Sequence, residues 1–239
     1  MALRIGLVFP GQGSQSVGMG KLLYDAYPSL KSVYDEASSV LGYDVAALCF
    51  AGPAERLNLT EFTQPALLVS SMAAFTLLEP VGLKPIAVAG HSLGEYSALV
   101  AAGGLEFRDA VGLVQKRGRY MSEAVAPGTG LVAALLGMTA ETVKDVCRLA
   151  SPTGVVAKTQ GCKKAILLPV SVPVHTRLMQ QAADRLAQDL AGVRWADLRA
   201  PLVNNAEAKA ISRANEIQAS LIRQLPSSVL WEDTVRTMG

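Results

Sequence analysis

The chain has 239 residues, half of them hydrophobic, which suits a main domain with a smaller insert better than two full domains. A formal net charge of +2 with 18% charged residues argues against a nucleic-acid or membrane-surface role based on overall charge. Three widely spaced cysteines provide no paired spacing for a disulfide framework or a metal site, which favours a reducing cytoplasm. The first residues lead straight into a predicted strand without a signal-peptide pattern, and no apolar run is long enough to span a bilayer.

The first half of the chain alternates between strand-like and helical segments. One predicted helix starts at Gln64, because Pro65 then occupies a favourable place in its first turn. Alternation of this kind indicates an α/β fold, with a parallel sheet covered by helices. The predicted elements are a strand at 3–9, a helix at 64–78, a strand at 86–89, and helices at 93–102 and 108–124.

The turn-forming sequence Pro-Gly-Thr-Gly at 127–130 marks the start of a predicted small α/β insert that extends to residue 168. Within the insert we expect a strand at 131–136, a helix at 139–149 and a strand at 165–168. After it the main domain resumes with a proline-containing loop at 169–173, a helix at 177–190, a strand at 202–203, and helices at 213–224 and 229–238.

The pentapeptide 90–94, Gly-His-Ser-Leu-Gly, directly follows a predicted strand and has the pattern of a nucleophile elbow. Glycines two positions on either side of Ser92 allow the sharp turn that points its hydroxyl outward, so Ser92 is the leading candidate for a covalent nucleophile. The backbone NH of Leu93, at the positive end of the following helix, is the natural donor to an oxyanion. An ordinary strand-to-helix connection with a capping serine is the alternative.

A serine hydroxyl needs a base to remove its proton, and the chain has only two histidines, His91 and His175. His91 adjoins the serine on an extended approach to the turn, so its side chain should point the other way. His175 follows a loop with two prolines that could hold an imidazole over the serine, which makes it the preferred base. A surface or helix-capping histidine fits the same residues equally well.

Two further segments are candidates for substrate contacts. The segment 9–15, Phe-Pro-Gly-Gln-Gly-Ser-Gln, lacks the lysine of a P-loop and suits the NH of Gln12 as a second oxyanion donor, with a plain turn as the alternative. Arg117 lies in the basic cluster 115–119, where one guanidinium could face the cleft and clamp a carboxylate while its neighbours face water. A fully solvated cluster is the alternative there.

Taken in order, these motifs resemble the malonyl-CoA:acyl carrier protein transacylases of fatty acid synthesis, and more distantly the acyltransferase domains of polyketide and animal fatty acid synthases. The matching segments are spread along nearly the whole chain, at 9–15, 63–65, 90–99, 117–118, 169–175, 203–205 and 223–225. The resemblance implies an α/β-hydrolase-like core, formed by 1–127 and 169–239, that carries a ferredoxin-like insert at 128–168.

We take a monomer as the default expectation, and the cysteine usage favours a cytoplasmic location. The resemblance also implies a ping-pong transfer that needs no metal or redox cofactor. Ser92 would take the malonyl group from malonyl-CoA and pass it to the phosphopantetheine thiol of acyl carrier protein, with His175 as base and then acid. By the same resemblance, the backbone NH groups of Gln12 and Leu93 would bind the oxyanion. Arg117 would pair with the malonyl carboxylate, and the backbone carbonyl of Gln224 would orient the histidine.

The chain departs from this family in two places. Between about residues 150 and 165, family members carry a longer segment that includes a further strand and helix. In this chain the residues that match before and after the missing stretch meet at Ala157-Lys158, which we call the seam. The chain also stops at Gly239, before the family's Gly-Pro-Gly-Lys segment and last helix. We therefore expect the small insert to be incomplete.

Two other functions compete with malonyl transfer. A serine esterase or thioesterase would share the elbow but place a strand-end acid between nucleophile and histidine, where this chain offers Glu123, Glu141 and Asp145 on predicted helices or in the insert. A non-catalytic module would bind the carrier protein without ever forming an acyl-serine.

Overall fold

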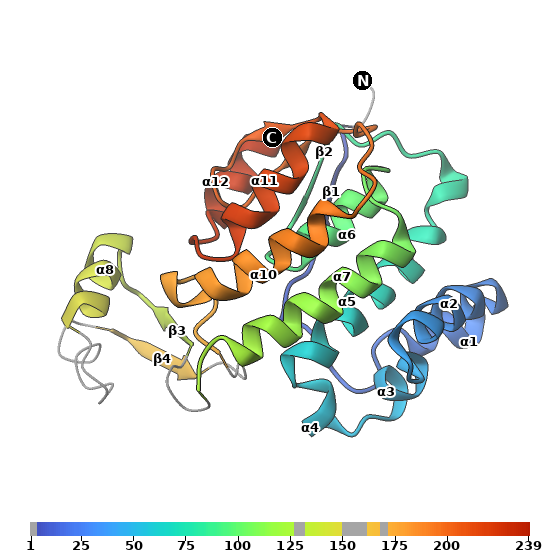
Figure 1. Cartoon of the computed structure of the whole chain (residues 1–239), viewed down its shortest axis with the longest axis horizontal. Coiled ribbons are helices and arrows are strands. Elements are labelled where there is room, and N and C mark those ends of the chain that lie inside the picture. The colour runs from blue at the N-terminus through green and yellow to red at the C-terminus, as the bar shows by residue number, and fades with distance from the viewer. Residues whose placement is uncertain (1–3, 127–131, 150–161, 168–171) are drawn as a thin grey trace.

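The computed structural model describes residues 4–126, 132–149, 162–167 and 172–239 (Figure 1). Its main sheet has the strand order β1-β2-β5-β6. β1 (Gly6–Phe9) and β5 (Leu202–Val203) both pair in parallel with β2 (Ala87–Gly90), and β6 (Ala210–Ile211) runs antiparallel to β5. The α/β fold predicted from the alternating pattern is therefore confirmed, with a mixed and mostly parallel sheet.

Helices pack on both faces of this sheet (Figure 1). α6 (Gly94–Ala101) contacts β1 and β2, and α12 (Trp231–Met238) contacts β2 and β5. The other helices outside the predicted insert are α1 (Lys21–Ala26), α2 (Lys31–Leu41), α3 (Val45–Ala51), α4 (Ala54–Leu57), α5 (Thr60–Thr76), α7 (Phe107–Glu123), α10 (Gln180–Ala191) and α11 (Ala214–Gln224), with 3-10 turns at Pro28–Leu30, Glu79–Val81 and Arg177–Met179. In β2, Ala87 and Ala89 pack in a cluster with Trp231 of α12, whereas Val88 belongs to the large core on the other face. β2 is thus buried on both sides, as its continuous apolar sequence indicated.

The helix expected to start at Gln64 starts four residues earlier, and Pro65 lies inside α5 instead of in its first turn, so that boundary was wrong. The earlier turn is held by backbone bonds from Phe62 and Thr63 to the carbonyl of Leu59, and by the Thr63 hydroxyl, which donates to the Leu57 carbonyl at 2.6 Å. These bonds form the turn before the proline, so the missing NH of Pro65 removes only one bond farther along the helix.

Within the range of the predicted insert, the described residues form a two-stranded antiparallel sheet and one helix, which project to one side of the main sheet in Figure 1. β3 (Ala133–Leu136) pairs with β4 (Lys164–Leu167), and α8 (Ala140–Leu149) lies between them in the chain. The predicted break at 127–130, residues 169–171 of the predicted proline-containing loop and the seam at Ala157-Lys158 lie outside the described residues.

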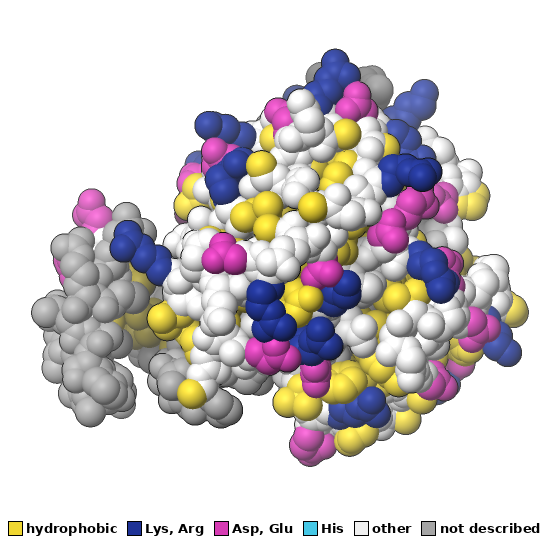
Figure 2. Space-filling view, in the orientation of Figure 1, with side chains coloured by type: hydrophobic (Ala, Val, Ile, Leu, Met, Phe, Trp, Pro, Cys, Tyr) yellow, Lys and Arg dark blue, Asp and Glu magenta, His cyan; other side chains and the backbone are white. Residues whose placement is uncertain are grey.

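Two surface properties bear on function. Figure 2 shows basic and acidic side chains interspersed over the visible face, which agrees with the small net charge. No helix among the described residues has the length and apolar character needed to cross a membrane.

Candidate active site

The turn at Ser92 is as tight as the glycine spacing predicted. A Cβ on Gly90 would lie 1.9 Å from the carbonyl carbon of Gly94, and a Cβ on Gly94 would lie 2.4 Å from the carbonyl oxygen of Phe9, so neither position has room for a side chain. Ser92 itself has a φ of 54°, in the left-handed region that non-glycine residues rarely adopt. The strand, turn and helix therefore meet with the geometry expected of a nucleophile elbow, with Ser92 at its tip.

Asn205 holds the elbow in this conformation. Its Oδ1 accepts a hydrogen bond from the Ser92 NH at 2.6 Å, and its Nδ2 donates to the Gly90 carbonyl at 2.8 Å. Asn205 follows β5, the parallel neighbour of β2, so both segments reach the same edge of the sheet. No physical role for the Asn205 side chain was predicted from the sequence, although its place just after a predicted strand was a usable signal.

His175 lies against Ser92, with its Nε2 2.7 Å from Ser92 Oγ. Its Nδ1 is 3.2 Å from the carbonyl oxygen of Gln224 and 3.1 Å from that of Ser227. Since carbonyls only accept hydrogen bonds, Nδ1 carries the proton and Nε2 is left free to accept one from the serine. Burial, with a further contribution from the Arg117 cation, lowers the pKa of His175 to about 4, so the ring is neutral at pH 7.

The other histidine contributes to packing beside the turn. The His91 ring meets the Trp231 ring edge to face, with centroids 5.3 Å apart. A Cβ on Gly11 would lie 2.5 Å from the His91 carbonyl oxygen, so Gly11 brings the segment that contains Gln12 against the elbow. Burial lowers the pKa of His91 below its ordinary value.

Arg117 projects from α7 into the protein interior and is only 1% exposed. Its Nη2 donates to Ser92 Oγ at 3.1 Å and to Gln224 Oε1 at 3.0 Å, and its Nη1 donates to Gln64 Oε1 at 2.7 Å. Gly118 permits this approach, because a Cβ there would lie 2.7 Å from the backbone of α5 at Glu61. All of these partners are neutral oxygens, so the cation sits beside the serine without a carboxylate bonded to it among the described residues.

The rest of the basic cluster faces solvent. Lys116 forms an ion pair with Asp189 at 2.5 Å, and Arg119 lies 3.7 Å from Glu123. This arrangement matches the expectation that one guanidinium of the cluster would point inward while its neighbours contact water. Burial lowers the pKa of Arg117, but a guanidinium stays charged in proteins.

Three polar groups in the site had no role in the functional analysis of the sequence: Gln64, Glu95 and the side chain of Gln224. Gln224 Nε2 donates to the Ser92 carbonyl at 2.9 Å and to Glu95 Oε2 at 2.6 Å. Glu95 is completely buried in α6, where burial raises its pKa to about 7. A lone carboxyl three residues after Ser92, in an otherwise uncharged helix, was the signal available in the sequence.

The two expected oxyanion donors come from different segments of the chain, the turn after β1 and the start of α6. Leu93 is the buried N-cap of α6, and Gln12 lies in the turn after β1 with its side-chain amide bonded to Thr60 at 3.1 Å. Within 4–126 and the other described ranges, neither backbone NH bonds to a protein acceptor. Both therefore are free to bind a substrate oxygen.

The acids that an esterase would need are elsewhere. Glu123 is at the end of α7, where it forms an ion pair with Arg185 at 2.6 Å, and Glu141 and Asp145 are exposed on α8. His175 is oriented by backbone carbonyls instead. No group of three His, Cys, Asp or Glu side chains that could hold a metal ion occurs in the described part of the chain.

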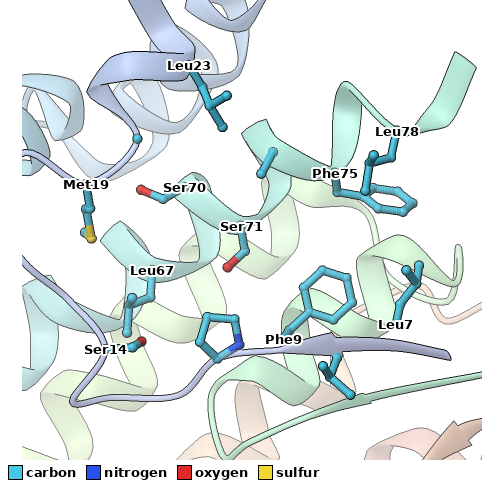
Figure 3. A pocket seen from close by; sticks show the side chains of 14 residues that line it. Leu7, Phe9, Ser14, Met19, Leu23, Leu67, Ser70, Ser71, Phe75 and Leu78 are labelled. Atoms are coloured by element: carbon cyan, nitrogen blue, oxygen red, sulfur yellow. The ribbon is translucent and has the colours of Figure 1, made fainter.

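An apolar pocket of about 450 Å³ lies between β1 and α5, away from these residues (Figure 3). Phe9, Leu67 and Phe75 are among its lining side chains, whereas Ser92 and His175 are not. The residues that could carry chemistry therefore lie outside this pocket.

Comparison with known proteins adds independent information. A family profile described as "Acyl transferase domain" matches residues 7–238. The malonyl CoA-acyl carrier protein transacylase of Escherichia coli is 42% identical over 259 residues, covering 97% of this chain and 84% of that protein, and the Bacillus subtilis enzyme of the same name is 41% identical over 262 residues, covering 98% and 83%. Both matched regions are longer than the 239 residues of this chain, so these relatives carry residues within the span that this chain lacks.

Solved structures agree with these matches. A crystal structure of an acyl carrier protein S-malonyltransferase from Vibrio cholerae has a TM-score of 0.91 and 42% identity, covering 98% of this chain and 85% of that one. A malonyl-transacylase in complex with a type II polyketide synthase acyl-carrier protein has a TM-score of 0.93 and 40% identity, covering 98% and 84%.

Proposed function

The chain belongs to the acyl transferase family, and we propose that it transfers the malonyl group from malonyl-CoA to the phosphopantetheine thiol of acyl carrier protein in fatty acid synthesis. The observation that carries the substrate assignment is the buried guanidinium of Arg117, 3.1 Å from the serine hydroxyl and bonded only to neutral groups in the described structure. A cation in this place favours an acyl group that carries its own carboxylate. His175 is oriented by backbone carbonyls and not by a carboxylate, and Arg117 is buried beside the serine; both features argue against a simple esterase.

In the first half-reaction, His175 Nε2 takes the proton from Ser92 Oγ as that oxygen attacks the thioester carbonyl of malonyl-CoA. The tetrahedral intermediate then expels the CoA thiolate, which takes the proton from His175 and leaves as the thiol. The product is a malonyl ester on Ser92. A neutral histidine is the form required at the start, in keeping with its lowered pKa.

In the second half-reaction, the carrier's phosphopantetheine thiol gives its proton to His175 and attacks the malonyl-serine ester. Collapse of the second intermediate returns the proton to Ser92 Oγ and releases malonyl-carrier protein. The NH groups of Gln12 and Leu93 stabilise the oxyanion in both steps, and the backbone carbonyl of Gln224 keeps the histidine tautomer fixed. All of these groups come from the chain, so the mechanism uses no cofactor.

The finer description of the fold belongs to the same proposal. We assign 1–127 and 169–239 to an α/β-hydrolase-like core and 128–168 to a ferredoxin-like insert, supported by the strand-elbow-helix arrangement at Ser92 and the separate β3-β4 sheet. Monomeric state and cytoplasmic location stay predictions from the sequence.

Intact-protein mass spectrometry tests the function directly. After brief incubation with malonyl-CoA the parent protein should gain one malonyl group, the Ser92→Ala variant should gain none, and added pantetheinylated carrier protein should remove the adduct. Release of the adduct to water with no malonyl-carrier formed would identify a hydrolase. A folded parent that binds the carrier but never forms the adduct would identify a binding module.

A further inference from the structure

Glu95 is an unusual residue to find directly beneath a nucleophile. It lies one turn after Ser92 in α6, is completely buried, and has one carboxyl oxygen, Oε1, without a partner in the described structure. Burying a carboxyl group is costly unless hydrogen bonds compensate it. Its remaining oxygen, Oε2, makes two such bonds, and both lead into the active site.

The two donors to Glu95 Oε2 are Gln224 Nε2 at 2.6 Å and the backbone NH of Asn205 at 3.3 Å. Asn205 is the residue whose side chain holds the peptide groups before and after His91, through the Ser92 NH and the Gly90 carbonyl. Gln224 is the residue whose side chain binds the Ser92 carbonyl and the Arg117 guanidinium. One carboxyl oxygen thus binds the side chain of Gln224 and the backbone of Asn205, the two residues whose side chains fix the Ser92 turn.

The amide of Gln224 can serve these partners in only one orientation. Arg117 only donates, so it must face Oε1, and the carbonyl of Ser92 only accepts, so it must face Nε2. Glu95 accepts from the same Nε2 and therefore favours this orientation over the flipped one. In the flipped amide two donors would meet at Arg117, and the guanidinium would lose one of the contacts that hold it beside Ser92.

We propose that Glu95 is a positioning residue for malonyl selection, which acts by accepting hydrogen bonds from Gln224 and Asn205 and thereby fixing Arg117 and the Ser92 peptide. The inference rests on the proposed function, because it assigns Arg117 to the malonyl carboxylate. It makes the acceptor oxygen of Glu95 the important property, ahead of its charge or its volume.

Three substitutions separate these properties. Glu95→Gln keeps the length and the acceptor oxygen but removes the charge, Glu95→Met keeps the length without an acceptor, and Glu95→Asp keeps the charge but draws the oxygen back by one methylene from a contact of 2.6 Å. If the acceptor oxygen matters most, the glutamine variant should keep malonyl selectivity best; if the charge matters most, the aspartate variant should. If only the volume matters, the methionine variant should be as selective as the glutamine variant. Ser97→Ala is a matched control on α6, because the buried Ser97 hydroxyl has no partner in the described structure.

The measurement is the single-turnover rate of acylation by malonyl-CoA and by acetyl-CoA, followed by intact mass, with thermal melting of each variant. General damage slows both substrates, whereas a displaced Arg117 slows only malonyl transfer. We expect Glu95→Met to lower the malonyl-to-acetyl rate ratio by about tenfold or more, and Glu95→Gln and Ser97→Ala to keep it within about threefold of the parent.

A folded Glu95→Met with an unchanged ratio overturns the proposal, as does a higher ratio for aspartate than for glutamine. If Glu95→Met does not fold, the comparison of Glu95→Asp with Glu95→Gln decides the question in the same way. A parent protein that is not malonylated at all contradicts the proposed function instead, and is recognised before any variant is compared.

Discussion

Replacement of Arg117 by methionine removes the cation to which we assign the malonyl carboxylate. The guanidinium is 1% exposed and lies 3.1 Å from Ser92 Oγ, so an acyl group joined to that oxygen places a terminal carboxylate close to the charge. A hydrogen bond to a charged group contributes about 1.5–3 kcal/mol, and two such bonds to one carboxylate about 3–6 kcal/mol. Their loss corresponds to a fall of about 10²–10⁴ in kcat/KM for malonyl-CoA.

The assay compares kcat/KM for malonyl-CoA and acetyl-CoA in the parent and in Arg117→Met. Acetyl-CoA has no carboxylate, so its kcat/KM should change by less than about tenfold. Arg119→Met is the matched control, because Arg119 is on the same helix but half exposed beside Glu123, and it should leave both values unchanged. Equal losses for the two substrates, or none for either, would refute the role assigned to Arg117.

Three further predictions concern the turn and the buried titratable groups. Gly90→Ala should cost more than about 4 kcal/mol in urea unfolding, because its Cβ would lie 1.9 Å from Gly94, whereas Gly112→Ala, with 3.7 Å of clearance inside a helix, should add about 0.5–1 kcal/mol. Since the pKa of His175 is lowered to about 4, the malonylation rate should be the same at pH 5.5 and 7.5, and a tenfold fall toward pH 5.5 would contradict this. The pKa of Glu95 is raised from 4.5 to about 7, so the folded state holds this proton more tightly and the parent should lose about 3 kcal/mol of stability as pH rises through that interval. Glu95→Gln should lack this dependence in unfolding measured at pH 5 and pH 8, and a matching slope in the variant would count against the assignment.

Much of the site follows from short-range sequence rules. The spacing of Gly90 and Gly94 around Ser92 is a local steric requirement, so it could be read before any tertiary contact was known. The strand before the turn and the helix after it were predicted from apolar runs, and both are present. The same rules missed the early start of α5, because the bonds that extend it before Pro65 come from neighbouring backbone groups and have no apolar periodicity.

Other parts of the site depend on contacts between distant segments. Gln224 reaches the Ser92 carbonyl across 132 residues, and Asn205 reaches the Ser92 NH across 113. Any buried amide could make the same hydrogen bonds, so the identity of each partner is decided only by which segments the fold brings together. Both residues lie in segments that resemble the family, 203–205 and 223–225, but no physical role for either side chain was predicted from the sequence.

By itself, the sequence determined the nucleophile turn, the alternation of strands and helices, and the choice between two histidines, because each depends on residue type and spacing along the chain. The sequence singled out Arg117 in the 115–119 cluster, but only the tertiary structure decided that this residue is buried and not solvated, since helical periodicity leaves the neighbouring helix unspecified and Gly118 sets that packing distance. It alone also placed Glu95 beneath the site, because a buried carboxyl is defined by the donors that surround it, and those come from segments more than 100 residues away.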